Sequence, residues 1–160
     1  MITIALAPSL AALARFISEQ RRRANYRALI TDRAADRENQ EDNEFIGVLG
    51  EIAYGKAMNL YVDLSWEPRS GGHDFMSAGH TIDVKTTRRA AALCVVDKPP
   101  EKRSDLYVWV RFDPGDDLHA YIVGFAWAEE VFAPQHEATG IDGRRYYRVP
   151  PDALHAFVKR

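Results

Sequence analysis

Several features that mark common classes of metal, redox and membrane protein are missing from this 160-residue sequence. Its one cysteine, Cys94, has no partner for an internal disulfide and lies in an apolar stretch, where a small core residue is expected rather than a nucleophile. The five histidines lack zinc-finger spacing. The longest apolar run near the N-terminus, Ile4 to Ala14, is interrupted by Pro8 and Ser9 and is too short to span a bilayer. We therefore expect a cytoplasmic protein without a structural zinc ion or a membrane segment.

Three motifs of well-known enzyme classes are also absent. The sequence has no Gly-x-x-x-x-Gly-Lys-Ser/Thr, no Gly-x-Ser-x-Gly and no His-Glu-x-x-His. These absences argue against an ATP-driven motor, a serine hydrolase of the nucleophile-elbow type and a zinc peptidase. We expect no nucleotide cofactor.

The net charge of −2 argues against a general polyanion-coating protein, but the charges are unevenly distributed. Residues 1 to 37 contain seven arginines and three acids, whereas residues 38 to 60 contain five acids and one lysine. Nucleic-acid binding needs a basic surface only where phosphates are contacted. Arg21, Arg22 and Arg23 are either such a phosphate clamp or a solvated helix end, where cations complement the helix dipole.

The length and the hydrophobic content of 46% fit one domain over residues 1–160, with an arginine-rich helical segment over about residues 1–37. Helical spacing of apolar residues predicts a helix from Ser9, as its N-cap, to about 23, and a second from about 40 to 60. Other patterns predict hairpins over 71–87 and over 106–125, strands at 92–96 and 146–149, and helices at 126–132 and 151–158. The fold class is therefore α/β.

The first hairpin carries the main candidate site. Its strands alternate on either side of a break at Ser77, Ala78 and Gly79. Side chains two apart in a strand share a face, so Asp83 and Lys85 emerge together, and hairpin pairing can bring Asp74 beside Asp83. Two carboxylates and an ammonium can hold a divalent cation and a charged group against it. The alternative is a surface ion pair worth less than about 1 kcal/mol.

The helix over 40–60 has unusual glycines. Gly47, Gly50 and Gly55 each cost about 1 kcal/mol relative to alanine inside a helix. Gly47 and Gly55 lie four residues either side of Glu51, on the same face of the helix. Because glycine has no side chain, we expect this face to lie close to the sheet and Glu51 to point at the hairpin. The alternative for Glu51 is an ordinary surface carboxylate.

The hairpin and the helix before it resemble the PD-(D/E)XK nuclease superfamily. The resemblance rests on His73-Asp74, eight intervening residues and Asp83-Val84-Lys85, with a histidine where the family usually has a proline. The phrase Gly47-x-x-Gly50-Glu51-x-Ala53 is similar to the helix that precedes the hairpin in many members. This resemblance implies a restriction-endonuclease-like fold, in which a mixed central β-sheet is flanked by helices.

The resemblance also implies a function for these residues. Asp74, Asp83, Glu51 and the Val84 carbonyl would hold Mg²⁺ or Mn²⁺, and Lys85 would orient the attacking water. The implied activity is metal-dependent hydrolysis of DNA phosphodiesters. Small phage or bacterial nucleases of recombination, repair or defence, including Holliday-junction resolvases, are the most similar members.

Two other functions stay open from the sequence. One is an inactive protein of the same fold that binds nucleic acid or a protein partner, and the other is an interaction protein unrelated to nucleic acid. Arg88 and Arg89, just past Lys85, either meet a phosphate backbone or are solvated. A homodimer is compatible with paired cuts in duplex DNA.

Overall fold

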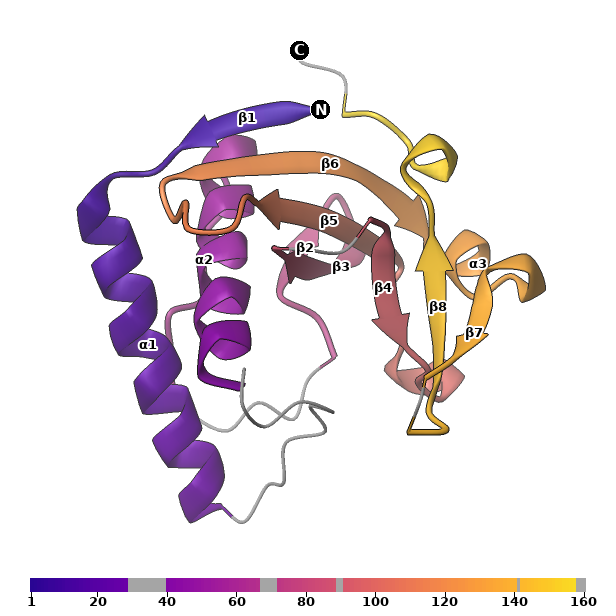
Figure 1. Ribbon diagram of the computed structural model, residues 1–160, viewed down its shortest axis with the longest axis horizontal. Helices are drawn as coiled ribbons and strands as arrows, with labels where there is room; N and C mark the ends of the chain where they lie inside the picture. Colours follow the sequence, from indigo (N-terminus) through magenta and orange to yellow (C-terminus); the bar gives the residue numbers. More distant parts are fainter. Residues whose placement is uncertain (29–39, 67–71, 89–90, 141, 158–160) are drawn as a thin grey trace.

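The computed structural model describes residues 1–28, 40–66, 72–88, 91–140 and 142–157 (Figure 1). It is a mixed α/β structure. The longer elements, in chain order, are β1 (Ile2–Ala5), α1 (Pro8–Arg27), α2 (Gln40–Met58), β2 (Phe75–Ser77), β3 (His80–Thr87), β4 (Leu93–Val96), β5 (Leu106–Phe112), β6 (His119–Trp127), α3 (Ala128–Val131), β7 (Glu137–Thr139) and β8 (Arg145–Val149). No described helix is both long and apolar enough to cross a membrane.

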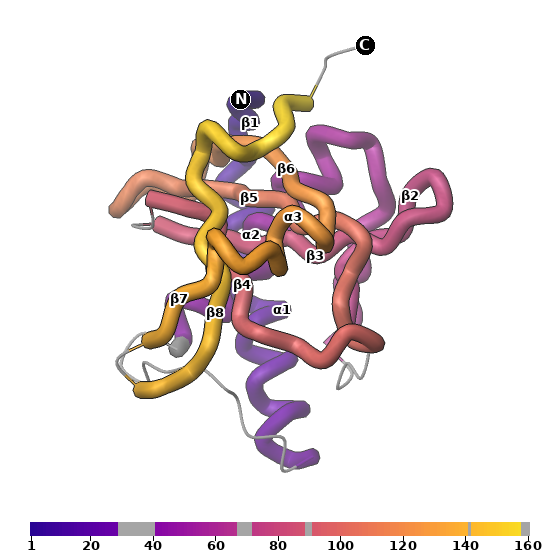
Figure 2. The backbone as a smooth tube through the Cα atoms, turned by 90° about the vertical axis from the view of Figure 1, so that its right-hand side faces the viewer, coloured from indigo at the N-terminus to yellow at the C-terminus, as the bar shows by residue number. Residues whose placement is uncertain are grey.

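Two sheets organise the chain. The larger has the strand order β1-β6-β5-β3-β2 and is mixed, because β3 and β5 run parallel while the other neighbours are antiparallel. The smaller sheet, β4-β8-β7, is antiparallel. In Figure 1, α2 lies against the larger sheet with α1 beside it. Figure 2 turns the smaller sheet toward the viewer, with α1 and α2 behind it.

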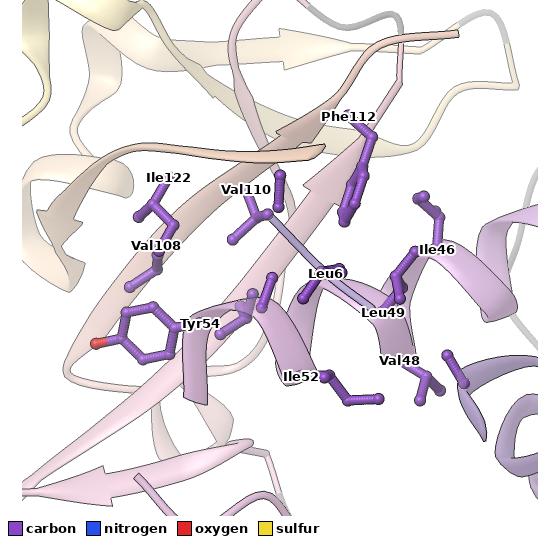
Figure 3. Packing of buried hydrophobic residues seen from close by; sticks show 14 of the residues in the cluster. Leu6, Ile46, Val48, Leu49, Ile52, Tyr54, Val108, Val110, Phe112 and Ile122 are labelled. Atoms are coloured by element: carbon purple, nitrogen blue, oxygen red, sulfur yellow. The ribbon is translucent and has the colours of Figure 1, made fainter. Parts of the chain in front are cut away.

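β5 is buried on both faces, which explains its nearly continuous apolar sequence. Val108, Val110 and Phe112 belong to the core that the helices cover (Figure 3). Tyr107 and Trp109 point the other way, into a second core shared with β4, β8 and α3. Because side chains alternate along β5, this one strand contributes to both hydrophobic cores, one on each face of the larger sheet.

Helix α1 is longer than the sequence predicted, and its N-cap lies two residues earlier. Its N-cap is Ala7 and Pro8 occupies the first turn, so the prediction that Ser9 is the N-cap was wrong. Proline suits this position because the first helical N–H groups have no partner within the helix. The helix continues to Arg27, and the arginine triplet 21–23 therefore lies within it rather than at its end.

The predicted helix over 151–158 is not formed in the described part of this segment. A single 3₁₀ turn, Pro151–Ala153, follows Pro150. The chain then pairs with β6, because the His155 N–H donates to the Phe125 carbonyl (2.8 Å) and the Phe125 N–H donates to the His155 carbonyl (3.0 Å). The edge of β6 thus supplies backbone hydrogen bonds that a longer helix would have made internally.

The first hairpin has the predicted form. β2 and β3 pair antiparallel with Phe75 opposite Ile82, and the turn between them has positive φ at Ala78 (50°) and Gly79 (82°). Two consecutive positive φ values are typical of a type I′ turn, whose twist matches that of the strands.

One glycine of α2 brings the helix against β3. A Cβ at Gly50 would lie 1.9 Å from the Thr86 Oγ1 and 2.9 Å from the Thr86 Cβ, so rotating the threonine could not relieve the clash. Gly47 has nothing within 4 Å, so the expectation that it too permits a close approach was wrong. Gly55 lies against Val62 and the Leu60 carbonyl, near the end of the helix.

These surroundings predict opposite effects of the same substitution at two positions. We expect Gly50→Ala to lower the free energy of unfolding by about 1–3 kcal/mol, because the added methyl overpacks the helix–sheet contact. Its control, Gly47→Ala, should raise stability by about 0.5–1 kcal/mol through helix propensity alone. Urea denaturation of both variants measures the difference, and an equal gain at both positions would contradict the packing argument.

Candidate functional site

The candidate site lies where the first hairpin opens. β2 begins at Phe75, so Asp74 is the last residue before the strand, and its N–H still donates to the Ile82 carbonyl (2.8 Å). The Asp74 Oδ2 accepts a hydrogen bond from the Val84 N–H (2.8 Å). The first acid is therefore hydrogen-bonded to the peptide group that joins Asp83 to Val84.

β3 divides its side chains between two environments. Ile82 and Val84 enter the core beneath the helices. Asp83 faces the other way and is only 4% exposed. The Lys85 Nζ lies 2.6 Å from the Asp83 Oδ1, so the two charged residues lie side by side as predicted. The Val84 N–H points toward Asp74, and because the N–H and C=O of one strand residue face the same neighbour, its carbonyl points to this edge as well.

A second lysine completes the environment of Asp83. The Lys98 Nζ lies 2.8 Å from the Asp83 Oδ2. The ammonium also lies 5.8 Å from the centre of the Tyr107 ring. Each carboxylate oxygen of Asp83 thus has its own ammonium. Lys98 is not among the residues that the sequence predicted for the site, because no spacing along the chain relates it to the hairpin.

Glu51 reaches the site from α2 and is held by Arg21. The Arg21 Nη1 lies 3.2 and 3.1 Å from the two Glu51 oxygens. The same guanidinium donates to the carbonyls of Asp63 (2.8 Å) and Ser65 (3.1 Å). Both side chains are largely buried, with 16% and 12% exposed. Arg21 therefore ties α1, α2 and the segment before the hairpin together.

The acids of the site act on one another electrostatically. Burial raises the pKa of Asp74 from 3.8 to about 7, and repulsion by Glu51 and Asp83 adds to the increase. The Val84 N–H and the Lys85 ammonium oppose it by stabilising the carboxylate. Residues 51, 74, 83 and 85 are thus brought together from three segments of the chain.

The carboxylates are oriented by partners within the protein. Within the described ranges, no three His, Cys, Asp or Glu side chains form a ready-made metal cluster. Glu51 is turned to Arg21, Asp83 to Lys85 and Lys98, and Asp74 to the Val84 amide.

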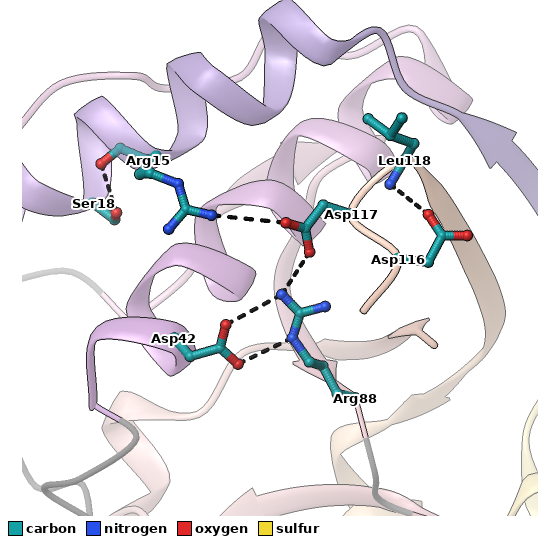
Figure 4. A network of polar contacts seen from close by, with 7 residues as sticks. All are labelled: Arg15, Ser18, Asp42, Arg88, Asp116, Asp117 and Leu118. Carbon is teal, nitrogen blue, oxygen red and sulfur yellow. Dashed lines mark hydrogen bonds and ion pairs between the residues drawn. The ribbon is translucent and has the colours of Figure 1, made fainter. Parts of the chain in front are cut away.

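The other arginines predicted to bind nucleic acid have different surroundings. Arg88 is largely buried and pairs with Asp42 (3.0 Å) and Asp117 (2.7 Å), and Asp117 also meets Arg15 (Figure 4). This network ties the start of α2 to the end of β3 and to the β5–β6 turn. Two further arginines form ion pairs on the helix surface, Arg22 with Glu41 and Arg23 with Glu19. Arg89 lies outside the described residues.

Comparisons of the chain with protein families, with curated proteins and with solved structures found no match.

The raised pKa of Asp74 predicts a pH dependence of stability. A folded-state pKa above the unfolded value means that the native protein binds the proton more tightly, so this contribution is complete below about pH 4 and is lost as the pH rises to about 7. Asp74→Asn keeps an acceptor for the Val84 N–H and removes the charge. We expect the variant to gain stability on the order of 2 kcal/mol at pH 8 relative to the wild type, and little at pH 4.

Urea denaturation from pH 4 to pH 8 measures this difference, with Asp152→Asn, an exposed aspartate of the last turn, as the control. Parallel stability curves for the wild type and Asp74→Asn would show that the Asp74 carboxylate is not destabilised in the fold.

Proposed function

We propose that the protein is a metal-dependent nuclease that hydrolyses DNA phosphodiester bonds at the open end of the first hairpin. The observation that carries the proposal is the hydrogen bond from the Val84 N–H to the Asp74 carboxylate (2.8 Å). It joins the first acid to the middle of the Asp83-Val84-Lys85 motif. Membership of the PD-(D/E)XK superfamily is part of the proposal, and the mixed sheet with helices packed on one face supports it.

The residues present fit a hard divalent cation. Mg²⁺ and Mn²⁺ prefer oxygen ligands, and the carboxylates of Asp74, Asp83 and Glu51 with the Val84 carbonyl would provide them. Burial, and then the neighbouring charges of Glu51 and Asp83, raise the pKa of Asp74, and a bound cation would offset both effects. A cation held there would lower the pKa of a bound water and neutralise charge on the phosphodiester.

The basic side chains have separate roles in this proposal. Hydrolysis adds water across one P–O bond and leaves a phosphate monoester and an alcohol. Lys85 and Lys98 have three N–H donors each, enough to keep their bond to Asp83 and to contact a phosphate oxygen or the attacking water. Arg21 is a positioning residue, because it donates to both carboxylate oxygens of Glu51 and so fixes the orientation of that side chain.

One observation favours a second candidate, the inactive binding protein of the same fold. Three carboxylates, Glu51, Asp74 and Asp83, are matched by the three cationic side chains of Arg21, Lys85 and Lys98. Such a site is electrically balanced without a metal ion. Catalysis in the proposed enzyme would require Lys85 and Lys98 to share Asp83 with the cation.

Cleavage assays test the proposed activity. We expect the wild type to cut at least one of linear duplex, circular duplex, single-stranded and four-way-junction DNA in Mg²⁺ or Mn²⁺, and none in EDTA. Asp83→Asn and Lys85→Ala should each lower the rate by at least about 100-fold, since each removes a charge next to the reacting phosphate. Asp152→Asn is the control. A folded wild type that cuts none of these substrates would overturn the nuclease proposal.

Metal binding can be measured independently of activity. Mn²⁺ in excess should raise the melting temperature of the wild type, because a ligand at 100 times its Kd adds about 2.7 kcal/mol to the stability of the state that binds it. Asp83→Asn should abolish the shift. Lys98→Met should tighten binding, because it removes an ammonium that competes for the Asp83 Oδ2. Calorimetry with the three proteins measures the constants, and no binding to the wild type would favour the second candidate.

A further inference from the structure

Two half-exposed aromatic rings, one on α1 and one from the segment that follows α2, lie together. Phe16 and Trp66 are each 51% exposed. Their ring centroids are 6.4 Å apart and their planes are nearly perpendicular, at 83°. An edge-to-face pair leaves part of each ring face uncovered. Exposed apolar groups of this size, when they cluster, mark binding surfaces.

The same side of α1 carries positive charge. Positions 16, 20, 23 and 27 share one helical stripe, so Phe16 is in line with Arg23 and Arg27. The helix contains five arginines and one glutamate. The Arg23 side chain is 60% exposed, and its ion pair with Glu19 is of the exposed kind that contributes at most about 1 kcal/mol. A phosphate can replace such a partner.

A third ring extends this surface toward the end of α1. Tyr26 is 82% exposed. With Arg22, Arg23 and Arg27 it lines a hollow of about 290 Å³. The ring thus shares this hollow with three arginines, a combination that suits a base together with its phosphates. We refer to Phe16, Trp66, Tyr26, Arg23 and Arg27 as the aromatic–arginine surface.

The surface is joined to the candidate site by one side chain. Arg21 donates to the carbonyl of Ser65, next to Trp66, and to both oxygens of Glu51. A nucleic-acid strand bound to Phe16 and Trp66 would therefore be separated from the Glu51 carboxylate by little more than the length of the Arg21 side chain.

We infer that the aromatic–arginine surface binds single-stranded nucleic acid and leads an unpaired strand to the candidate site. Bases stack on the exposed rings and phosphates pair with the arginines. Ring stacking selects single strands, because the bases of a duplex are already stacked on their neighbours and their faces are covered. The inference rests on the proposed function for what happens to the strand, and it makes single strands, flaps or frayed ends the substrate class.

Binding measured without cleavage tests the inference. Wild-type protein in EDTA is titrated into a fluorescein-labelled oligonucleotide and into the matching duplex, at a fixed salt concentration, and anisotropy gives Kd. We expect the single strand to bind more tightly. Trp66→Ala and Phe16→Ala should each weaken single-strand binding by about tenfold or more and duplex binding by less than about threefold. Arg23→Gln should weaken both and reduce the salt dependence.

The control is Met76→Ala, which truncates another large exposed apolar side chain, on β2. Its Kd values should match those of the wild type. Equal affinity for both forms of DNA, or unchanged single-strand binding by folded Trp66→Ala protein, would overturn the inference. If either result is found and the wild type still cleaves DNA in a metal-dependent way, the nuclease proposal is supported without the single-strand surface. Tight single-strand binding without cleavage would contradict the nuclease proposal and support the binding surface.

Discussion

The close contact between α2 and β3 at Gly50 is the constraint on which the candidate site depends. With no side chain at this position, the helix backbone packs directly on Thr86. The next residue, Glu51, is thereby brought into electrostatic range of Asp74, although Asp74 and Asp83 belong to a hairpin further along the chain. The buried face of α2, with Phe45, Leu49 and Ile52, holds the helix in this position. The relative positions of site residues on a helix and on a strand depend on how tightly the two elements pack.

The smaller sheet also serves the site, by fixing the connection that carries Lys98. Arg103 donates from Nε to the Lys98 carbonyl (2.9 Å), and its guanidinium carbon lies 3.7 Å from the centre of the Phe132 ring. Phe132 packs on Tyr147 of β8 and on Tyr107 of β5. The second core thus orders a loop whose lysine meets Asp83 on the first sheet.

Charge balance is the other physical feature of the site. Buried carboxylates without partners are strongly unfavourable, and each acid here is stabilised by a cation or an amide. Asp74 is the least stabilised of the three, because burial, and then the charges of Glu51 and Asp83, raise its pKa to about 7 although it accepts a hydrogen bond from the Val84 N–H. Under the nuclease proposal, a bound cation would offset both the cost of burying Asp74 and the repulsion among the three acids. The same balance makes the inactive alternative physically reasonable, and the two proposals differ in two measurable properties, DNA cleavage and metal affinity.

The sequence alone determined the features that depend on local periodicity. Alternation and turn residues defined the hairpin and placed Asp83 beside Lys85, and apolar spacing located α2 to within two residues of its end at Met58. Only the tertiary structure decided the partners: Arg21 meets Glu51 across 30 positions, Lys98 meets Asp83 across 15, and Arg88 meets Asp42 across 46. The physical reason is that backbone preferences act over a few residues. Ion pairs, and the choice of Gly50 rather than Gly47 as the contact point, depend on which surfaces packing brings together.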